Sequence, residues 1–374
     1  MEAMTGQSTR RKATTSIVVF LAILIILVFD AFSSEDLLAN LSGGLEAAES
    51  VTTPIPGTDT WYAIYFTDPA GPGAVSLRGG PDEALGFAID QARMSVDIAI
   101  YDFDLVSVRN ALLSAHRRGV SVRMVTDSDN RDEPEVQDLI DDGIPVLGDR
   151  REGLMHNKFV IIDRFEVWTG SMNFTSNGAY KNNNNLIRLR SSRLAENYLR
   201  EFEEMFVDDE FGPRSPANTP YSSLSIDGTR LEVYFSPDDG TAAHLVDLIG
   251  SAQESIYFLA YSFTADDLAA AMLARSNAGV TVSGVFEQLQ YRSNIGTEFD
   301  LFRLNDVDVR LDGNPRSMHH KVIIIDRSVV VTGSYNFSAS AEDSNDENTL
   351  IIYNPEIAAL YLDEFQRVVK EAEP

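Results

Sequence analysis

The chain carries one long segment twice, and this internal repeat constrains the fold more than any other feature. The segment MHNKFVIIDRFEVWTGSMNFT, which contains His156, returns as MHHKVIIIDRSVVVTGSYNFS around His319. The two histidines are 163 residues apart, and the same offset relates Tyr198 to Tyr361 in the closing segments. A correspondence of this length predicts two copies of one structural unit rather than one large domain.

Each copy alternates strand-like and helix-like segments. Runs around Tyr101 (SVDIAIYDFD) and Tyr261 (ESIYFLAYSFT) precede helical patterns that end at Gly119 and Gly279, and a second apolar strand pattern follows each glycine. This order predicts an α/β fold with a mostly parallel sheet covered by helices on both faces, hence two homologous α/β/α sandwich units. Two homologous units pack most simply about a pseudo-twofold axis, so we expect a monomer that contains an intramolecular pseudo-dimer.

Composition marks the boundaries between the parts of the chain. A Pro-, Ser- and Asn-rich stretch separates the two copies, and a stretch that ends in TTPIPGTDT precedes the first copy. We predict a basic N-terminal segment at 1–12, an apolar segment at 13–32, a linker at 33–59, the first unit at 60–211, a linker at 212–229 and the second unit at 230–374.

The apolar segment near the N-terminus is typical of a targeting sequence. Three basic residues at 10–12 precede the unbroken apolar run IVVFLAILIILVF. A cleaved signal peptide and an uncleaved membrane anchor both fit, and we favour the anchor because Asp30 interrupts the approach to a small-residue cleavage site. In either case we expect the rest of the chain outside the cytoplasm, anchored to the membrane or secreted.

The net charge of −27 comes from 57 acidic and 30 basic residues, and the chain contains no cysteine. The absence of cysteine excludes disulfide scaffolds, thiol nucleophiles and cysteine-based zinc sites. A strongly acidic surface repels polyanions at low ionic strength, which disfavours broad binding of nucleic acid. Because lysine is scarce as well, we expect a halophilic protein adapted to molar salt, where counterions screen the repulsion; a wide solubility margin is the alternative.

The scarce residue types recur in one repeated pattern. Two of the five histidines and two of the five lysines fall in the motif H-x-K-x4-D. A G-S-x-N motif follows, and a polar residue stands 28 positions after each histidine, a combination that rarely arises by chance. The first copy contains His156, Lys158, Asp163, Gly170, Ser171, Asn173 and Asn184, and the second contains His319, Lys321, Asp326, Gly333, Ser334, Asn336 and Glu347.

The spacing of these residues has chemical meaning. Histidine and lysine are two positions apart ahead of a β-branched run, so on a strand both side chains project to the same side. A twofold arrangement would bring two imidazoles, two ammonium groups, two hydroxyls and two amides to one cavity. Such a cavity can bind a tetrahedral anion with donors on every side, and it contains a nucleophile and an acid for phosphoryl transfer.

With these motifs the sequence resembles the phospholipase D superfamily, whose signature is the doubled H-x-K-x4-D with G-S-x-N following. The resemblance spans nearly all of residues 60–374 and implies two α/β/α units that share one active site. It also implies metal-independent phosphodiester cleavage through a covalent phosphohistidine, with no cofactor. Members cleave phospholipid head groups, transfer phosphatidyl groups or cut nucleic acid, so the resemblance leaves the substrate open.

Four functions are therefore compatible with the sequence. The membrane-proximal position favours a hydrolase that acts on phospholipid head groups. A nuclease that cleaves DNA or RNA is the first alternative, because the copies are compact and lack accessory lipid-binding domains. A phosphatidyltransferase, in which an alcohol replaces water, and a non-catalytic anion-binding surface protein are the others.

The two copies differ where one has Asn184 and the other has Glu347, and this difference predicts separate roles for the histidines. A carboxylate favours the protonated imidazole, whereas a neutral amide leaves the lone pair available. We therefore expect Glu347 to hold His319 as the general acid, and Asn184 to orient His156 as the nucleophile. The resemblance points to the same nucleophile.

The remaining residues are expected to bind the phosphate or to support the fold. The predicted ligands of the non-bridging oxygens are Lys158, Lys321, Asn173 and Asn336, with Ser171 and Ser334 as weaker candidates. The motif residues predicted to be structural are Asp163, Asp326, Gly170 and Gly333. The aromatic residues expected to pack in the core are Tyr101, Phe103, Tyr261 and Phe263.

Overall fold

The computed structural model describes residues 60–372 of the chain. The predicted segments 1–12, 13–32 and 33–59 lie outside the described residues, so the targeting sequence stays a prediction. Within residues 60–372, no helix combines the length and the apolar character needed to span a membrane.

Both repeats fold into strands and helices in the same order. The first half contains β1 (Tyr62–Phe66), α3 (Pro72–Ser76), α4 (Pro81–Asp90), β2 (Ser95–Ile100), α5 (Val106–Arg117), β3 (Ser121–Thr126), α6 (Pro134–Asp141), β4 (Val146–Gly148), β5 (Lys158–Ile162), β6 (Glu166–Gly170), α7 (Ser176–Tyr180), β7 (Asn182–Asn183), β8 (Asn185–Arg190) and α8 (Ser192–Glu203). The second half contains β9 (Ser223–Ile226), β10 (Thr229–Ser236), α9 (Thr241–Gly250), β11 (Ser255–Ala260), α10 (Asp266–Asn277), β12 (Thr281–Phe286), α11 (Gln288–Ser293), α12 (Phe299–Leu304), β13 (Asp308–Leu311), β14 (Ser317–Met318), β15 (Lys321–Ile325), β16 (Val329–Gly333), α13 (Ala339–Asp343), β17 (Glu347–Tyr353) and α14 (Pro355–Glu371).

Each half is built on one large sheet, and the two sheets correspond strand for strand. The first has seven strands in the order β1-β8-β6-β5-β2-β3-β4. The second has eight, and its order β10-β17-β16-β15-β11-β12-β13 repeats the first, with β9 added at the edge. The predicted α/β class is confirmed.

The direction of the strands differs from the prediction. In the first sheet only the β2–β3 and β3–β4 neighbours are parallel, and the other four pairs are antiparallel. The prediction of a mostly parallel sheet is therefore wrong. A parallel pair needs a crossover such as α5, whereas β5 and β6 are joined directly by a short turn in which Asp163 and Arg164 have positive φ.

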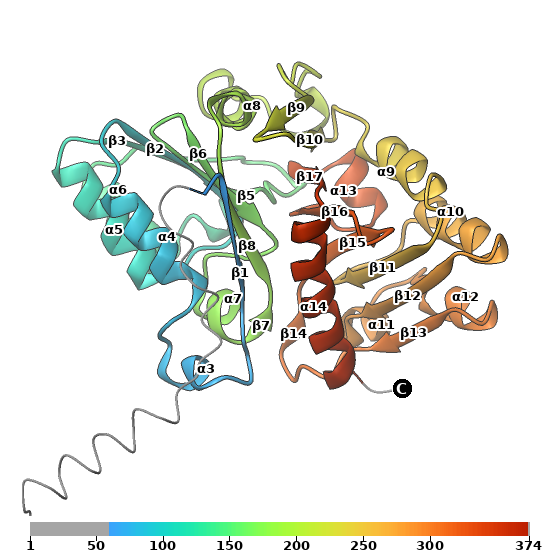
Figure 1. The fold of residues 1–374 in the computed structure, drawn as a ribbon. Coiled ribbons are helices and arrows are strands. Elements are labelled where there is room, and N and C mark those ends of the chain that lie inside the picture. Colours follow the sequence, from blue (N-terminus) through green and yellow to red (C-terminus); the bar gives the residue numbers. More distant parts are fainter. Residues whose placement is uncertain (1–59, 373–374) are drawn as a thin grey trace, which may run out of the picture. The chain divides into compact units, whose positions relative to one another are not determined.

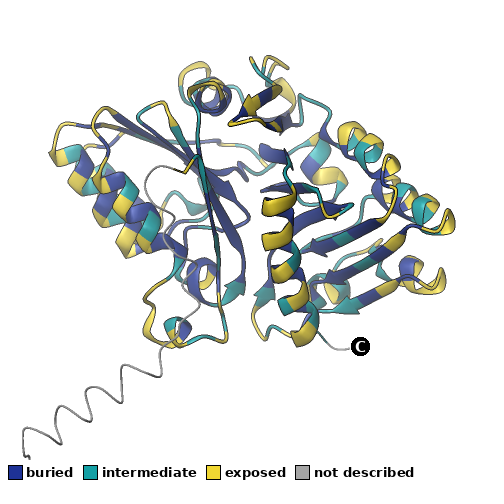
Figure 2. Ribbon diagram, viewed as in Figure 1, coloured by how far each residue is buried: buried dark blue, intermediate teal, exposed yellow. Residues whose placement is uncertain are grey.

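Helices cover both faces of each sheet (Figure 1). On the outer face of the first sheet, α4, α5 and α6 bury Leu85, Leu112 and Leu139, and α9, α10 and α12 cover the second sheet in the same way. The inner faces of both sheets share one core with α8 and α14, in which Tyr198 and Tyr361 are fully buried. Figure 2 shows the buried strands between helices whose outward surfaces are exposed. One hydrophobic core therefore joins the two halves.

Local sequence explains how α8 and α14 begin and which face they bury. The Ser191 hydroxyl accepts a hydrogen bond from the N–H of Leu194, and the Asn354 side chain accepts from two N–H groups in the first turn of α14. Along α14 the apolar residues Ile357, Tyr361 and Phe365 recur every four positions, which places them on one face. That face packs into the shared core.

Two short backbone pairings join the halves at equivalent positions. Asn183 of β7 lies opposite Met318 of β14, and Met155 forms an isolated bridge with Asp346. The two methionines are 163 residues apart, and so are Asn183 and Asp346, so each contact is the counterpart of the other. Two units packed about a pseudo-twofold axis make reciprocal contacts of this kind.

The segment 212–229, predicted as a linker, is partly folded into the second sheet. Its strand β9 pairs with β10 in antiparallel register, with Leu224 opposite Leu231. The side chain of Asn197 in α8 donates to the carbonyl of Tyr221 and accepts from its N–H, both at 2.9 Å. The alternating burial along β9 gives this segment an apolar face that a free linker lacks.

Asp163 and Asp326 each hold the start of a neighbouring strand. The Asp163 carboxylate accepts from the backbone N–H groups of residues 93–95, at 2.7 to 3.1 Å. Asp326 accepts from those of residues 253–255 over the same range of distances. Burial acts to raise the pKa of Asp326, but the three backbone bonds outweigh it and lower the pKa. Both carboxylates thus serve the fold.

Replacing Asp326 with Asn should lower the free energy of unfolding at pH 7 by about 1–2 kcal/mol, because a charged acceptor of backbone hydrogen bonds is lost. The folded-state pKa is depressed, so this stability is present above the usual aspartate pKa and is lost as pH falls through the folded value. Urea unfolding at pH 7 and at pH 3 should therefore show a difference that shrinks in acid. The exposed carboxylate Asp363, changed to Asn, is the control and should have no effect. An equal loss at both pH values would contradict this account.

Candidate active site

The two H-x-K pairs lie where two central strands begin. Lys158 is the first residue of β5 and Lys321 the first of β15, and each histidine stands two residues earlier. The exposed fractions are 5% for His156, 0% for Lys158, 7% for His319 and 1% for Lys321, so bulk water has little access to the cluster.

Backbone bonds to the opposite half hold both histidines. The N–H of His156 donates to the carbonyl of Asp346 at 3.0 Å, and the N–H of His319 donates to the carbonyl of Asn183 at 2.9 Å. Burial lowers the pKa of both imidazoles well below the usual value, and the lysines of both halves lower it further. The structure thus brings the two copies of the motif into one site.

The side-chain contacts of the histidines cross between the halves. Nδ1 of His156 lies 2.8 Å from each carboxylate oxygen of Glu347, and Nδ1 of His319 lies 3.0 Å from Oδ1 of Asn184. The prediction that Glu347 orients His319 and Asn184 orients His156 is therefore wrong. Each orienting residue follows the histidine of its own copy by 28 positions, but the interface places it beside the histidine of the other copy.

The contacts of His319 fix the position of its ring proton. Asn184 donates through Nδ2 to the carbonyl of Gly178 at 2.9 Å, so its Oδ1 faces the imidazole. Nδ1 of His319 also lies 3.0 Å from the carbonyl of Ser171. Since both neighbours are acceptors, Nδ1 carries the proton and Nε2 of the neutral ring has a free lone pair.

Burial also dominates the electrostatics of the His156–Glu347 pair. It raises the pKa of Glu347 to about 8, while the ammonium groups of Lys158 and Lys321 act in the opposite sense and favour the carboxylate. When Glu347 is ionised it accepts the Nδ1–H of His156, which leaves the Nε2 lone pair free.

Each lysine is held by the histidine of its own motif. Nζ of Lys158 donates to the carbonyl of His156 at 2.6 Å, and Nζ of Lys321 donates to the carbonyl of His319 at 2.9 Å. Burial lowers the pKa of Lys158 to about 7 and that of Lys321 well below its usual value, while Glu347 opposes the shift in both. A bound anion would favour the charged form of both lysines.

Tyr101 and Tyr261 belong to the site, which the sequence did not reveal. Their ring centres lie 5.0 and 4.4 Å from the imidazole of the same half, and 5.3 and 4.5 Å from the lysine Nζ. Both are only partly buried, so the expectation of core packing is wrong for them. Phe103 and Phe263, two residues further on, do lie in the outer cores.

The serines of the G-S-x-N motifs hold the orienting residues. Oγ of Ser171 accepts from the N–H of Asn185 at 3.1 Å and donates to Oδ1 of Asn184 at 2.8 Å. Ser334 makes the equivalent contacts in the second half. The single hydroxyl proton of each serine is donated within the protein here, so their contact with substrate stays the weaker prediction.

Asn173 and Asn336 are motif residues whose side chains still have hydrogen-bonding capacity for a ligand. Their side-chain oxygens are buried and have no hydrogen-bond partner within residues 60–372. Rotation of either amide about its terminal bond exchanges this oxygen for N–H donors, which a non-bridging phosphate oxygen can accept.

The glycines of the same motif keep the backbone close to the neighbouring strand. Gly170 has a φ of +146°, and a Cβ there would lie 2.4 Å from the carbonyl oxygen of Asn185. Gly333 is in the same situation, so both positions exclude any larger residue.

Asn185 and Asn348 are buried polar residues that the sequence analysis left without a role. Oδ1 of Asn185 accepts from the hydroxyls of Thr332 and Tyr361 at 2.9 and 3.3 Å, and Asn348 makes the equivalent contacts with Thr169 and Tyr198. Each asparagine therefore bonds across the interface. The sequence does contain a sign of them: Asn185 and Asn348 are identical residues at equivalent positions of the two copies, directly after Asn184 and Glu347.

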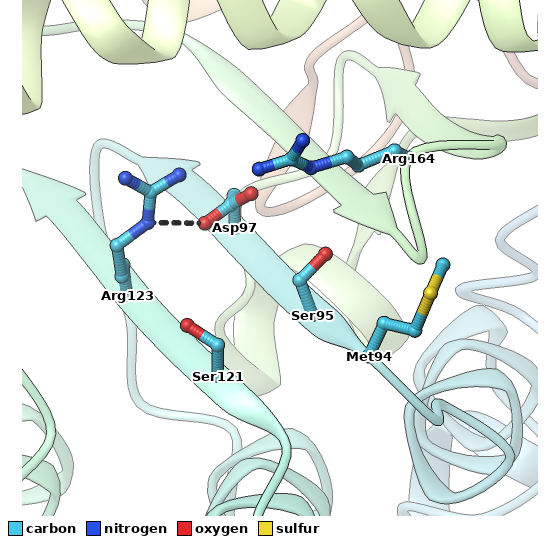
Figure 3. Close-up of a pocket in the computed structure, with 6 residues that line it drawn as sticks. All are labelled: Met94, Ser95, Asp97, Ser121, Arg123 and Arg164. Atoms are coloured by element: carbon cyan, nitrogen blue, oxygen red, sulfur yellow. Dashed lines mark hydrogen bonds and ion pairs between the residues drawn. The ribbon is translucent and has the colours of Figure 1, made fainter.

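A separate pocket lies at the opposite end of the first sheet (Figure 3). Its lining consists of Met94, Ser95, Asp97, Ser121, Arg123 and Arg164, and Nε of Arg123 bonds Asp97 at 2.7 Å. Lys158 pairs with the last residue of β2, whereas this pocket lies at the first residues of β2. It therefore contains none of the predicted site residues. Within residues 60–372, no group of three or more His, Asp or Glu side chains is arranged to hold a metal ion.

Comparison with known families gives the site its context. The family described as "Cardiolipin synthase, PLD-like domain" matches residues 87–206 and 245–369, once in each half. The chain belongs to the phospholipase D-like family. This membership makes it a phosphodiesterase-type protein.

Individual members support the same assignment. A phospholipase D of Rickettsia felis is 30% identical over 161 residues, which cover 43% of this chain and 80% of that protein. A mitochondrial cardiolipin hydrolase of Xenopus laevis is 33% identical over 171 residues, 45% of this chain and 71% of that protein. Among solved structures, a phosphatidylserine synthase of Haemophilus influenzae shares the fold, with a TM-score of 0.63 and 15% identity over 83% of this chain and 86% of that one.

The tautomer of His319 can be tested without any substrate. Nitrogen-15 NMR of protein labelled in its five histidines should show His319, assigned with His319→Gln, as the neutral Nδ1–H form at pH 7. Asn184→Leu should reduce this form in favour of Nε2–H, because one acceptor for the Nδ1 proton is lost. The signal of His116, a surface histidine of α5, is the control. A wild-type His319 in the Nε2–H form would contradict the geometry.

Proposed function

We propose that this protein is a phospholipase D-type hydrolase that cleaves phospholipid head groups through a covalent phosphohistidine. One observation carries the proposal: two buried His–Lys pairs meet in one site, and each imidazole is bonded at Nδ1 by a residue of the opposite half. This leaves both Nε2 atoms for the reacting phosphodiester. A pseudo-twofold relation between the halves accounts for the paired arrangement.

His156 is the proposed nucleophile, for a different reason from the one that the sequence offered. Attack by Nε2 forms a nitrogen–phosphorus bond and makes the imidazole cationic. The group at its Nδ1 is the carboxylate of Glu347, at 2.8 Å, and an adjacent opposite charge stabilises that cation. Glu347 therefore favours the phosphohistidine.

His319 is the proposed general acid. When the anionic phosphodiester binds, its charge favours the imidazolium, so Nε2 of His319 takes up a proton from water. In the first step this proton passes from Nε2 to the leaving oxygen as the phosphorus–oxygen bond breaks. Its Nδ1–H is bonded by an amide and a carbonyl, which stabilise an imidazolium less than a carboxylate does, so the proton leaves readily. In the second step the same nitrogen accepts a proton from water, whose oxygen attacks phosphorus and releases His156.

The phosphate is bound by the residues with free donors. The ammonium groups of Lys158 and Lys321 and the amides of Asn173 and Asn336 supply positive charge and hydrogen bonds to the non-bridging oxygens. Because two lysines supply the charge that phosphoryl transfer needs, we propose that the reaction is metal-independent and needs no cofactor.

The similar proteins and the negative charge of this protein favour phospholipid over nucleic acid as the substrate. The relatives reported above are named phospholipase D and cardiolipin hydrolase. Around the site, Asp102 and Asp127 act on the charge of Lys158, and Glu287 acts on that of Lys321. At low ionic strength these carboxylates and the net charge of −27 disfavour a polyanionic strand more than a single phosphodiester.

The location and the solvent are part of the same proposal. Residues 13–32 would anchor a monomeric protein in the membrane with its active site outside the cytoplasm, or direct its secretion if they are cleaved. Adaptation to high salt would explain how so acidic a surface tolerates a membrane of anionic lipids.

The decisive experiment separates the candidate substrates. Three purified proteins are compared at high salt: the wild type, His156→Ala and the surface variant His116→Ala. Each is incubated in separate reactions with phospholipid vesicles, single-stranded DNA and a bis-aryl phosphodiester. We expect turnover of phospholipid and of the aryl diester, loss of at least about 1,000-fold in His156→Ala, and no effect of His116→Ala. A reaction quenched with denaturant at alkaline pH, where the nitrogen–phosphorus bond is stable, should leave the phosphorus label on His156.

Other outcomes assign other functions. Cleavage of DNA without phospholipid would replace the proposal with a nuclease, and exchange of an added alcohol in place of water would make the protein a phosphatidyltransferase. No turnover of any substrate would leave an anion-binding protein. Label on His319 would reverse the two histidine roles.

The pH dependence of kcat/KM should reflect Glu347. The carboxylate form of Glu347 favours the nucleophile and the ammonium form of Lys158 binds the phosphate, so kcat/KM should be bell-shaped, with its maximum between the Lys158 pKa of about 7 and the Glu347 pKa of about 8. Glu347→Gln should remove the rising limb and lower the maximum by roughly 100-fold. A retained rising limb in that variant would assign it to another group.

A further inference from the structure

We propose that His320 and Glu364 are positioning residues that control the acid chemistry of His319 through a buried chain of hydrogen bonds. The inference rests on the proposed function and deepens it. The chain, here called the His319 relay, runs through Glu364, His320, Asn185, Ser171, Asn184 and His319. All six side chains are buried.

The outer end of the His319 relay is an ionised carboxylate. Arg367 bonds both oxygens of Glu364, through Nε at 2.8 Å and through a terminal nitrogen at 2.6 Å. Burial acts to raise the pKa of Glu364, but His320 and Arg367 outweigh it and lower the pKa. Glu364 is therefore an acceptor, and Nε2 of His320, 2.8 Å away, must donate to it.

The bond from His320 to Glu364 determines which groups donate and which accept in the following hydrogen bonds of the His319 relay. Burial lowers the pKa of His320, so the ring is neutral and its Nδ1 accepts from the amide of Asn185 at 3.1 Å. The same Asn185 amide also donates to Oγ of Ser171 at 3.3 Å, beside the Asn185 backbone N–H at 3.1 Å, so the only proton of Ser171 goes to Oδ1 of Asn184. Asn184 therefore presents an acceptor to His319. The arrangement fixes the proton of His319 on Nδ1 and directs Nε2 to the leaving group.

The first half contains the matching chain with different residues. The His156 relay runs through Glu201, Asn157, Asn348, Ser334, Glu347 and His156. Asn157 replaces His320, and it bonds Glu201 at 3.0 Å and Asn348 at 2.9 Å. Glu204 occupies the position of the first half that is equivalent to Arg367 in the second half. Burial and neighbouring carboxylates raise the pKa of Glu201 well above its usual value, so they disfavour a negative charge at this end of the relay.

When Glu347 is ionised, as the proposed mechanism requires, the two relays carry their negative charge at opposite ends. In the His156 relay it lies on Glu347, in contact with the reacting ring. In the His319 relay it lies on Glu364, five hydrogen bonds away. A contacting carboxylate stabilises a cationic ring strongly, whereas a remote one orients the ring and lets its proton leave. We infer that this difference separates the nucleophile from the acid in two otherwise equivalent halves.

Leaving-group dependence tests the inference. An acid is needed to expel an alkyl alcohol but much less to expel 4-nitrophenolate. We therefore compare kcat/KM for phosphatidylcholine and for phosphatidyl-4-nitrophenol in the same detergent micelles. Glu364→Gln should lower the first value by about tenfold or more and the second by less than about threefold.

Matched variants separate positioning from simple support of the fold. His320→Leu should show the same leaving-group dependence, whereas His320→Asn should keep the wild-type ratio of the two values, because Asn157 shows that Asn can make both bonds. Glu201→Gln, the equivalent change in the other half, should not alter the ratio. If Glu364→Gln fails to fold, the comparison of His320→Leu with His320→Asn decides the matter.

The failure of this inference differs from the failure of the proposed function. If the wild-type protein turns over neither lipid, the proposed function is contradicted. A wild-type protein that turns over both, with variants of Glu364 and His320 that lose both activities equally, overturns the relay and leaves the function intact.

Discussion

Each reacting histidine is held by the half of the molecule that does not contain it. The backbone of His156 is bonded by Asp346 and its ring by Glu347, while Asn183 and Asn184 hold His319 in the same way. An imidazole reacts through Nε2 only when Nδ1 is bonded and the ring is oriented. Neither half therefore presents a complete site, and the shared core around α8 and α14 fixes the catalytic geometry as well as the fold.

Duplication supplies two equivalent sets of groups, but the proposed hydrolysis gives the two histidines different roles. Among the positions at which the halves differ are Asn184 against Glu347, Asn157 against His320 and Glu204 against Arg367. These positions lie along the hydrogen-bonded chains that end on the histidines. Because a buried proton has few acceptors to choose from, a single change of residue type can set the direction of a whole chain.

The sequence predicted much of this, and its errors have physical causes. The repeat predicted two α/β units, since a 163-residue offset that holds through motifs and closing helices requires one fold twice. The mostly parallel sheet was wrong because β5 and β6 form a hairpin that strand spacing alone cannot distinguish from a crossover. The motif also did not show that Ser171 donates its proton to Asn184, because that contact depends on the folded chain. Tyr101 resembled a core residue because ring contacts with His156 depend on neighbouring strands.

The sequence alone determined which chemical groups are available: two imidazoles, two ammonium groups, three amides and one carboxylate, in a doubled motif too long to arise by chance. Only the tertiary structure decided which group acts on which. His319 and Asn184 are 135 positions apart, and His156 and Glu347 are 191 apart. Hydrogen bonds form over about 3 Å of space whatever the separation along the chain. The packing of the two halves therefore assigned the carboxylate to His156 and the amide to His319.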